Sequence, residues 1–509
     1  MIKRALISVW DKEGVVELGQ FLQKNNIEIL STGGTQTALE NAGVKVTSVS
    51  EITGTGAVMD GRVKTLDPKI FGGILADRNN QSHLSDLKEI NGLEIDLVVV
   101  NFYPFVNEAV NKKLTFSKAI EFIDIGGPSM IRAAAKNYHS IVPLCSPSFY
   151  EEYMIEFKSN MGEIPLHIRQ KYACEVFFMT SKYESAIYNY FNSETDGFLQ
   201  TMNLSLTKAE ELRYGENPHQ DAAFYLPTGK ELPWYQLQGK ALSYNNYADM
   251  ESAIAMVLEF DVPACAIIKH SNPCGFGVGD SIQDAYHRAV STDPVSYFGG
   301  IVAFNKSVDK NTAEALLKPF LECIIAPEVT PEALAILKKK KNLRVVTVGE
   351  NYKPSHDSIK SVAGGFLVQQ RDSDQGELNN LEIVTELQPS TDQLAAMKLG
   401  WILVRYVKSN GIVYSNSTQL LGVGAGQMSR IDSVKIGIRK VNEAGLNLDG
   451  SILASDAFFP FADSIDIAAK QGVKVIIQPG GSIKDQDVIN KANELGLVMA
   501  FTKTRHFYH

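Results

Sequence analysis

The sequence has few of the features that mark secreted, disulfide-bonded or membrane-spanning proteins. It has only five cysteines in 509 residues, widely spaced and odd in number: Cys145, Cys174, Cys265, Cys274 and Cys323. This usage argues against a disulfide framework and favours a reducing compartment, so we expect a cytoplasmic protein. No apolar run approaches the roughly 20 residues that a membrane-spanning helix needs, so we expect no membrane partner.

Positive charge is also scarce. Lys and Arg total 49 against 58 Asp and Glu, which gives a formal net charge of −9. This balance disfavours a nucleic-acid-binding surface, although a few cations and backbone N–H groups can still bind a small anionic ligand. The apolar fraction of 44% is typical of a globular protein, and 509 residues are too many for one core, so we expect at least two domains.

The first part of the chain, to about residue 150, alternates short apolar runs with helical patterns. Such alternation is typical of a parallel sheet with helices on its faces. The first apolar run is cut off by Asp11, Lys12 and Glu13, so we interpret it as a strand rather than a signal peptide. We predict strands at residues 5–9, 27–30, 97–100 and 141–144, and helices at 15–25 and 35–41.

The middle of the chain contains a candidate domain boundary. A long helix is predicted over residues 166–192, and the polar, pattern-poor stretch at 192–206 follows it. Strands and helices alternate again after this stretch, and no repeat of short period is present. The clearest part predicts a strand at 473–478, a turn at 479–481, a helix at 485–495 and a strand at 496–501.

Two segments of the first part have the composition of phosphate-binding loops. Ser31–Thr35 follows a strand and opens a helix, so its glycines and the hydroxyls of Thr32 and Thr35 could surround an anion. A plain turn with a threonine cap is the alternative. Gly61–Leu66 places Arg62 and Lys64 on one side of an extended segment, which suits a phosphate, and a solvated basic loop explains it equally well.

A candidate acid–base cluster involves three further segments. Asn101–Pro104 follows a buried strand, and Ile123–Pro128 leads into a helix that carries Arg132 and Lys136 four residues apart. Lys136, Asp124 and Tyr103 together would supply acid–base groups above the phosphate pocket. In the alternative interpretation, the alanine-rich face of the helix packs on the sheet while Arg132 and Lys136 point to water.

The second part contains the pentad His270-Ser271-Asn272-Pro273-Cys274, between Lys269 and Gly275. It follows an apolar run that we interpret as a buried strand, and reacting groups commonly lie at strand ends in α/β sheets. We expect a Pro-Cys-Gly turn behind the strand and a neutral His270, held so by the adjacent ammonium of Lys269 and able to accept a proton. A strand end that merely carries two polar residues is the alternative.

Other motifs of the second part exclude two kinds of site. Gly422–Gln427 lacks the last glycine of the dinucleotide fingerprint, so we do not expect NAD. Pro273-Cys274 is similar to half of a zinc deaminase motif, but residue 277 is Gly and no His-x-Glu precedes it, so we expect no zinc. The aromatic-rich loop Ser455–Asp463 suits a flat heteroaromatic ligand, or simply a core.

Taken together and in order, these segments resemble the phosphoribosylaminoimidazolecarboxamide (AICAR) formyltransferase/IMP cyclohydrolase family. The resemblance runs from Ile7 to His509, and Trp10 departs from it, because a small hydroxyl residue is expected there. The segments that carry the resemblance are Gly61–Leu66, Ile123–Gly127, Arg132–Asn137, Leu212–Gln220, Lys269–Gly275 and Asp456–Phe461.

The resemblance implies a fold and a set of partners. It implies a methylglyoxal-synthase-like parallel-sheet domain over 1–195, a linker over 196–206, and a transformylase region of two cytidine-deaminase-like α/β lobes over 207–509. It implies a homodimer with the transformylase site at the interface, small-molecule substrates (AICAR, FAICAR, IMP and folate), 10-formyltetrahydrofolate as co-substrate, and no catalytic metal. Whether a structural monovalent cation is bound stays open.

The resemblance also implies residue roles by position. In the cyclohydrolase, Lys136 matches the general acid/base, Tyr103 lines the site, and Asp124 matches a nucleotide contact. Further nucleotide contacts match Asp11, Lys12, Thr32, Gly33, Gly34, Thr35, Arg62, Lys64, Thr65, Asn101 and Ile125. In the transformylase, His270 matches the proton acceptor, with Lys269 beside it. The residues that match AICAR contacts are Arg213, Tyr214, Asn410, Arg430, Asp463 and Arg505. The residues that match folate or substrate-pocket positions are Gly299, Ile431, Phe458, Ser482 and Ile483. Phe507 and His509 match the functional tail.

Two reactions are then expected. His270 removes a proton from the AICAR amine as it attacks the formyl group, while Lys269 and Asn410 stabilise the oxyanion. FAICAR then closes its ring to IMP while Lys136 moves protons and Asp124 orients the carboxamide. Two alternatives remain: a nucleotide-binding regulatory module without chemistry, and an amide-forming or deaminating enzyme that needs a metal or a nucleophilic Cys274.

Overall fold

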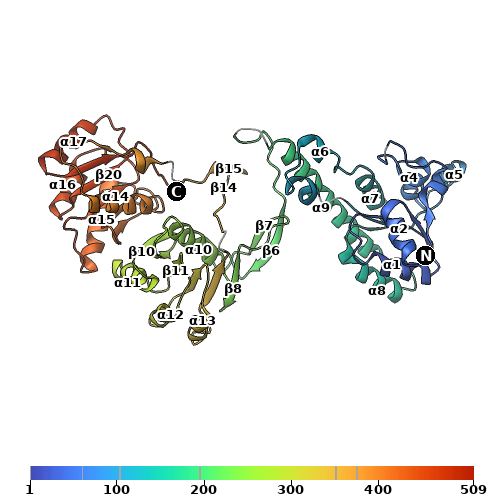
Figure 1. Cartoon of the computed structure of the whole chain (residues 1–509), viewed down its shortest axis with the longest axis horizontal. Coiled ribbons are helices and arrows are strands. Elements are labelled where there is room, and N and C mark those ends of the chain that lie inside the picture. Colours follow the sequence, from blue (N-terminus) through green and yellow to red (C-terminus); the bar gives the residue numbers. More distant parts are fainter. Residues whose placement is uncertain (1, 60, 103–104, 194–196, 350–351, 374–375) are drawn as a thin grey trace. The chain divides into compact units, whose positions relative to one another are not determined.

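The computed structural model describes residues 2–59, 61–102, 105–193, 197–349, 352–373 and 376–509. The chain divides into two compact units, residues 1–206 and 207–509. Figure 1 colours them from blue to green and from green to red. Within the described residues, no helix is both long enough and apolar enough to cross a bilayer.

The first unit is built on the expected parallel sheet. Its strand order is β3-β2-β1-β4-β5, and every neighbouring pair is parallel. The central strands are buried on both faces, which explains why they are continuous apolar runs in the sequence. The strands are β1 (Arg4–Val9), β2 (Glu28–Ser31), β3 (Thr47–Ser48), β4 (Leu97–Asn101) and β5 (Val142–Leu144).

Helices cover both faces of this sheet. One core cluster packs α1 and α8 on one face, and a second packs α4, α7 and α9 on the other. The long helix predicted for residues 166–192 is α9, and its buried residues lie against α7 and the sheet. The helices are α1 (Val15–Lys24), α2 (Gly33–Asn41), α3 (Val49–Thr53), α4 (Pro68–Leu75), α5 (Gln81–Glu89), α6 (Phe116–Ile120), α7 (Gly126–Lys136), α8 (Tyr150–Ser159) and α9 (Leu166–Phe191).

The second unit contains two lobes, each with a six-stranded mixed sheet. We call them lobe A, from β8 to β13, and lobe B, from β16 to β21. Lobe A has the sheet order β10-β9-β11-β12-β13-β8. Its elements are β8 (Trp234–Gln238), α10 (Tyr244–Val257), β9 (Ala264–Lys269), β10 (Asn272–Val278), α11 (Ile282–Thr292), β11 (Ile301–Phe304), α12 (Lys310–Leu316), β12 (Cys323–Ala326), α13 (Pro331–Leu337) and β13 (Arg344–Val348).

Lobe B has the sheet order β16-β21-β20-β19-β17-β18. The strand and helix predictions near the end of the chain correspond to β20, α17 and β21. The elements of lobe B are β16 (Glu382–Ile383), α14 (Thr391–Val404), β17 (Ile412–Ser415), β18 (Leu420–Gly424), α15 (Arg430–Glu443), β19 (Ile452–Ser455), α16 (Asp463–Lys470), β20 (Val475–Gln478), α17 (Asp485–Glu494) and β21 (Val498–Phe501).

The two lobes have the same topology. In each, a strand, a helix and a hairpin are followed by three helix–strand pairs, and the parallel and antiparallel pairs match. The first residue of β11 pairs with Ile268 and the first residue of β19 with Ser415, so a shift of 147 positions superposes the two hairpins. The same shift carries Ser243, which caps α10, onto Ser390, which caps α14.

The lobes share one interior. A single core cluster combines apolar residues of α10, β9 and β11 with those of α14, β19 and β20. Helices α11–α13 cover the other face of the lobe A sheet, and α15–α17 cover the other face of the lobe B sheet. Two short ribbons lie outside these sheets: β6 (Leu206–Leu212) with β7 (Ala222–Pro227), and β14 (Asp357–Val362) with β15 (Gly365–Gln370).

Candidate functional site

The first unit has a pocket of about 910 Å³ at the carboxyl ends of its central strands. The sheet order places β1 between β2 and β4, so the chain leaves β1 on one side and returns on the other. Such a switch point is where α/β sheets bind ligands. Helices α2 and α7 both begin at the pocket, with Thr32 and Ile125 as their N-caps, so the N–H groups of two helix N-termini lie beside it.

Most of the predicted cyclohydrolase residues line this pocket. Trp10 lines it as well and is 41% exposed. Asp11 and Lys136 are not among the lining residues, and Tyr103 lies outside the described residues. The predicted residues that line it are Lys12, Thr32, Gly33, Gly34, Thr35, Arg62, Lys64, Thr65, Asn101, Asp124 and Ile125.

The loop after β1 is held by the side chain of Asn101, at the end of β4. Its Oδ1 accepts hydrogen bonds from the backbone N–H groups of Trp10 (2.7 Å) and Asp11 (2.9 Å), and its Nδ2 donates to the carbonyl of Asp11 (3.0 Å). The ammonium of Lys12 donates to the carbonyl of Trp10 at 3.1 Å. Asn101 therefore shapes the mouth of the pocket through the backbone of the neighbouring loop.

The hydroxyl of Thr35 does not serve as the anion donor that the sequence predicts. It donates its proton to the carbonyl of Val9 (2.9 Å) and accepts the N–H of Val9 (3.0 Å). Thr35 is buried. A hydroxyl has only one proton, so this bond to β1 leaves none for a ligand. Thr35 instead anchors the first turn of α2 beside β1.

The basic segment Gly61–Leu66 forms a turn, so the extended conformation predicted for it is wrong. Val58 and Val63 form an isolated bridge around the turn, and Gly61 has a φ of 88°, which favours glycine. Arg62 pairs with both carboxylate oxygens of Glu121, at 2.5 and 2.7 Å. Lys64 folds back, so that its Nζ would lie 3.7 Å from a Cβ built on Gly33. Its ammonium therefore lies beside the N-terminus of α2.

Asp124 lies at the opposite wall, before the first turn of α7. Its Oδ1 accepts the N–H of Gly127 at 3.0 Å, and its own N–H donates to the hydroxyl of Tyr183 at 2.7 Å. Burial raises the pKa of Asp124 above its usual value, and the N–H groups of α7 and the ammonium of Lys64 offset this in part. Tyr183 belongs to α9, and no sequence motif of the pocket pointed to it.

Lys136 lies at the other end of α7 from Asp124, so the two do not come together as predicted, and Tyr103, the third member of the predicted cluster, lies outside the described residues. The helix begins at the pocket with Gly126 and ends with Lys136, and ten residue steps span about 15 Å. Arg132 and Lys136 are exposed, while Ala133, Ala134 and Ala135 pack inside. The alanine-rich face therefore packs inside, as the alternative interpretation expects, while Arg132 reaches α9 and donates to the hydroxyl of Thr180 at 3.4 Å.

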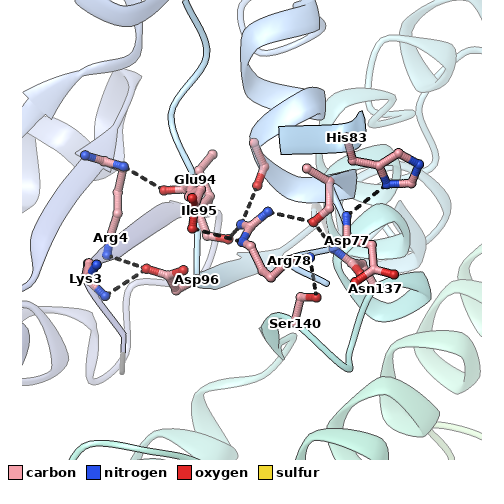
Figure 2. A network of polar contacts seen from close by, with 12 residues as sticks. Lys3, Arg4, Asp77, Arg78, His83, Glu94, Ile95, Asp96, Asn137 and Ser140 are labelled. Carbon is pink, nitrogen blue, oxygen red and sulfur yellow. Dashed lines mark hydrogen bonds and ion pairs between the residues drawn. The ribbon is translucent and has the colours of Figure 1, made fainter. Parts of the chain in front are cut away.

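The far end of α7 is fixed by the polar network of Figure 2. Asn137, the residue after Lys136, donates to the carbonyls of Ile74 (2.8 Å) and Ala76 (3.0 Å). The guanidinium of Arg78 donates to the carbonyls of Gly73 and Ile95, both at 2.9 Å, and pairs with Glu94 at 3.3 Å. Ile95 precedes β4, so this network lies at the edge of the sheet opposite the pocket.

The catalytic candidate of the second unit lies on a two-residue turn between β9 and β10. Lys269 pairs with Asn272, and His270 and Ser271 between them have φ values of 53° and 57°. Pro273, Cys274 and Gly275 belong to β10, so the predicted Pro-Cys-Gly turn is wrong. Positive φ at both central residues defines a type I′ turn, which favours Asn-Gly and costs other residues roughly 1–2 kcal/mol each.

Asp249 on α10 holds this turn, and no sequence motif pointed to it. Its carboxylate accepts the N–H of Ser271 at 2.6 Å and the N–H of His270 at 3.3 Å, and it accepts the hydroxyl of Ser271 at 3.2 Å. The helix that carries it begins with a capping box of Ser243 and Asn246. His270 itself is exposed.

Lys269 and Asn272, on either side of the turn, connect it to other segments. The ammonium of Lys269 donates to the carbonyl of Phe298 at 2.9 Å, next to the predicted pocket residue Gly299. Asn272 donates to the carbonyl of His270 (3.1 Å) and accepts the N–H of Lys408 (3.1 Å). The turn of lobe A therefore lies against the Lys408–Asn410 segment of lobe B.

Asn410 is not placed as the oxyanion donor that the sequence predicts. Its Nδ2 donates to the carbonyls of Gln427 (2.9 Å) and Met428 (3.1 Å), and both of its amide protons are used. Its Oδ1 accepts from Arg430 at 2.8 Å. Arg430 is buried, and it also pairs with the fully buried carboxylate of Asp456. This part of the predicted site therefore supports the fold.

The C-terminal tail is fixed against the same segment. Ser409 donates its N–H to the carbonyl of Tyr508 (2.9 Å), and its hydroxyl accepts the N–H of Tyr508 (3.1 Å). His506 is buried between the carboxylates of Asp372 (2.7 Å) and Glu377 (3.1 Å). Arg505 lies 4.3 Å from the ring centre of Phe507. The predicted tail residues are thus brought towards Asn410.

Other predicted transformylase residues are not joined to the turn. Arg213 packs over the ring of Tyr214 at 5.4 Å, Asp463 accepts the N–H of Ser464, and Ile483 is fully exposed. In the part of the chain that the structure describes, no hydrogen bond links the following residues to His270: Arg213, Tyr214, Ile431, Phe458, Asp463, Ser482 and Ile483.

Cys274 is unsuited to nucleophilic catalysis. Burial and the nearby Asp293 raise its pKa to about 12, and its thiol points to the carbonyl of Ile267 at 3.4 Å. A thiol with so high a pKa holds almost no thiolate at neutral pH. Among the described residues, no group of three or more His, Cys, Asp or Glu side chains is arranged to bind a metal ion.

Comparison with known proteins decides the family. The profile described as "AICARFT/IMPCHase bienzyme" matches residues 134–440, and that of the MGS-like domain matches residues 14–129. The chain belongs to the AICARFT/IMPCHase bienzyme family. It is 47% identical over 519 residues to the "Bifunctional purine biosynthesis protein PurH" of Rippkaea orientalis, with 100% of each chain covered. Proteins of the same name from Synechocystis and Clostridium botulinum are each 48% identical, again with 100% of each chain covered.

The family confirms the fold and function that the resemblance implied. The protein is an α/β bifunctional enzyme of purine biosynthesis, with an MGS-like unit on a parallel sheet and a region of mixed sheets. Its two activities are formyl transfer to AICAR and cyclisation of the product to IMP.

Proposed function

We propose that the second unit transfers the formyl group at the His270 turn and that the first unit cyclises the product in its pocket. The observation that supports the first assignment is the position of His270, which is exposed on a fixed turn where the two lobes and the C-terminal tail meet. The formyl donor in this proposal is 10-formyltetrahydrofolate.

The formyl transfer requires one proton acceptor and one stabilised oxyanion. The AICAR amine nitrogen bonds to the formyl carbon, and His270 takes the amine proton as the tetrahedral adduct forms. The bond from the formyl carbon to the folate nitrogen then breaks, and that nitrogen takes a proton, which leaves FAICAR and tetrahydrofolate. Lys269 donates one N–H to Phe298, so two N–H groups remain for the oxyanion.

The cyclisation proceeds within one bound molecule. The carboxamide nitrogen of FAICAR bonds to its own formyl carbon, and water leaves, so the pocket mainly holds a compact conformer. The N-termini of α2 and α7 would receive the phosphate and the polar groups of the base. Since Lys136 is remote, we assign the proton movements to Lys64 and Asp124, which both line the pocket and interact electrostatically.

We also propose the following finer assignments. The first domain spans residues 1–195 and a linker spans 196–206.

Two copies associate in the cytoplasm, with the transformylase site completed at the interface. The ribbon β14–β15 supports the association, because it exposes Ile359, Val362, Phe366 and Leu367 to solvent. Sedimentation of the purified chain should give twice the monomer mass, and a monomer at micromolar concentration would contradict this proposal.

The test of the two activities is a coupled assay of the whole chain. With AICAR and 10-formyltetrahydrofolate supplied, tetrahydrofolate should appear first and IMP after it. FAICAR alone should give IMP without folate. Turnover of neither substrate would refute the proposal.

Trp10 provides a direct test of the cyclohydrolase pocket. The chain has three tryptophans, and the other two, Trp234 and Trp401, are buried. IMP should therefore change the fluorescence of Trp10, and a Trp10→Phe variant should lose that change while still cyclising FAICAR. If IMP changed the fluorescence of the Trp10→Phe variant as much as that of the wild type, the nucleotide would bind elsewhere.

A further inference from the structure

We propose that Asp249 is a positioning residue for formyl transfer: its carboxylate holds the left-handed His270-Ser271 turn and so presents the imidazole of His270. The inference rests on the proposed function of His270. It begins from a mismatch between the sequence of the turn and its conformation. Type I′ turns favour Asn-Gly because both central residues need positive φ, yet His and Ser occupy these positions with φ values of 53° and 57°.

Side chains with a Cβ adopt this conformation only when the surroundings impose it. Here the constraint comes from α10. Both N–H groups of the turn point at one carboxylate, with Ser271 at 2.6 Å and His270 at 3.3 Å, and the Ser271 hydroxyl adds a third contact at 3.2 Å. Hydrogen bonds to an ionised acceptor are stronger than those between neutral groups, so this carboxylate can offset the strain of both residues.

Lobe B provides the matched comparison within the same chain. The shift of 147 positions that superposes the hairpins carries His270 and Ser271 onto Ser417 and Thr418. Neither of these two residues has a positive φ. The N–H of Thr418 is bound within the turn itself, by the side chain of Asn416 at 2.9 Å. Lobe B therefore builds the same connection without strain and without help from its helix.

The helix of lobe B offers no carboxylate. The same shift carries Asp249 onto Ala396 of α14, which is buried. Its backbone carbonyl accepts the hydroxyl of Ser415 at 3.3 Å, so this helix contacts the strand and not the turn. The carboxylate and the strained turn therefore occur together in the lobe that carries His270, and both are missing from the lobe that does not.

This pairing identifies what the carboxylate does. If Asp249 only stabilised the helix–hairpin packing, lobe B would need an equivalent group, because its topology is the same. The strained turn instead sets the direction of the histidine side chain, since a residue in the left-handed region projects its Cβ differently from one in an ordinary turn. A base that is misplaced by about 1 Å can lose about 10²-fold in rate.

The first experiment compares Asp249→Ala and Asp249→Asn with the wild-type chain in separate assays of formyl transfer and FAICAR cyclisation. Asp249→Ala should lower kcat for formyl transfer by about 10- to 100-fold, with a smaller change in KM, because the base is misplaced while the ligand contacts remain. Asp249→Asn retains one acceptor oxygen and should lose less. Cyclisation should stay unchanged in both variants, which reports that the first unit is intact, and a cooperative thermal unfolding transition of the second unit reports that it is folded.

The second experiment tests whether the effect passes through the turn. Glycine adopts the left-handed conformation without strain, so Asp249→Ala/Ser271→Gly should recover a large part of the lost kcat. Asn416→Ala is the matched control, because it removes the side chain that organises the equivalent turn of lobe B. It should lower thermal stability without lowering kcat for formyl transfer.

The outcomes separate this inference from the proposed function. His270→Ala is measured in the same assay, and if it transfers formyl at a near-normal rate, the proposed function itself fails. If His270→Ala is inactive while Asp249→Ala stays within twofold of wild type, only the inference fails. The inference would also fail if the double variant Asp249→Ala/Ser271→Gly recovered no activity. It would fail as well if Asn416→Ala lost as much kcat as Asp249→Ala. If Asp249→Ala does not fold, Asp249→Asn decides by the same criteria.

Discussion

The two lobes of the second unit have one architecture and two different hairpin turns. Lobe A builds its turn from His270 and Ser271 in the left-handed region, held from α10 by a carboxylate. Lobe B builds the equivalent turn from Ser417 and Thr418 in ordinary conformations, closed by the neighbouring Asn416. The difference shows that the fold itself does not require the strained turn. Strain that the architecture does not need is typical of a functional site.

The lobes also divide the remaining roles. Lobe B supplies a polar network in which the buried Arg430 bonds to both Asp456 and Asn410. This network fixes the segment that touches the turn of lobe A and the C-terminal tail. In the proposed mechanism, lobe A carries the reactive group, and lobe B carries the network that fixes the segments around it. The predictions below test this division.

The largest effect should come from replacing the first central residue of each turn with alanine. His270→Ala removes the proton acceptor and should lower formyl transfer by about 10²- to 10⁴-fold. Ser417→Ala, at the equivalent position of lobe B, should leave the rate within twofold. Stopped assays of FAICAR formation from AICAR measure both. Equal rates for the two variants would remove the functional distinction between the lobes.

The next effect concerns the first unit, where the comparison is between a lysine at the pocket and a lysine at the far end of α7. Lys64 lies at the pocket and Lys136 at the opposite edge of the sheet. Lys64→Met should lower FAICAR cyclisation by about 10²-fold or more, since it removes both a proton donor and a charge. Lys136→Met should change it far less. A loss in Lys136→Met that equals the loss in Lys64→Met would contradict the assignment.

A smaller effect should appear in stability when glycine replaces the second residue of each turn. Ser271→Gly relieves a strained conformation, whereas Thr418→Gly adds freedom to the unfolded chain and removes the hydrogen bond from the Thr418 hydroxyl to Asn416 at 3.1 Å. The free energy of unfolding of the first variant should therefore exceed that of the second by about 1 kcal/mol. Denaturant unfolding followed by the fluorescence of the buried Trp401 measures the difference. A more stable Thr418→Gly variant would show that the lobe A turn is not strained.

The smallest effect is a pH-dependent change at Asp124. Burial raises its pKa, so the folded unit binds the proton more tightly than the unfolded chain does. Stability therefore falls as pH rises from the unfolded pKa to the folded pKa, and the ionised carboxylate destabilises the fold at neutral pH. Asp124→Asn should raise the free energy of unfolding at pH 7, and the gain should vanish below about pH 4. Urea titrations of the first unit's transition at both pH values test this, and a gain confined to low pH would contradict it.

The sequence predicted the regular parts of the fold well, because buried strands and amphipathic helices leave periodic signals. The parallel sheet of the first unit and the last strands of lobe B were visible in this way. Periodicity did not show the equivalence of the lobes, which only the family resemblance implied, since it is carried by the order and direction of strands and by a shift of 147 positions. A search for repeats of short period could not detect a relation over 147 positions.

The site was predicted less completely, for reasons that differ between residues. Lys136 has the right chemistry, but the length of α7 carries it away from Asp124. Thr35 and Asn410 have the right donors, but backbone carbonyls use their protons. Asp249 and Tyr183 act on backbone groups that lie 22 and 59 positions away in the chain, and no local motif reports such contacts.

The most direct test of the account is a crystal structure of the chain with AICAR and a folate analogue that lacks the formyl group. The account predicts the AICAR amine about 3 Å from the imidazole of His270, within hydrogen-bond reach, with both φ values of the turn still positive. An amine bound at the Ser417-Thr418 turn, or at any position beyond the reach of His270, would contradict it.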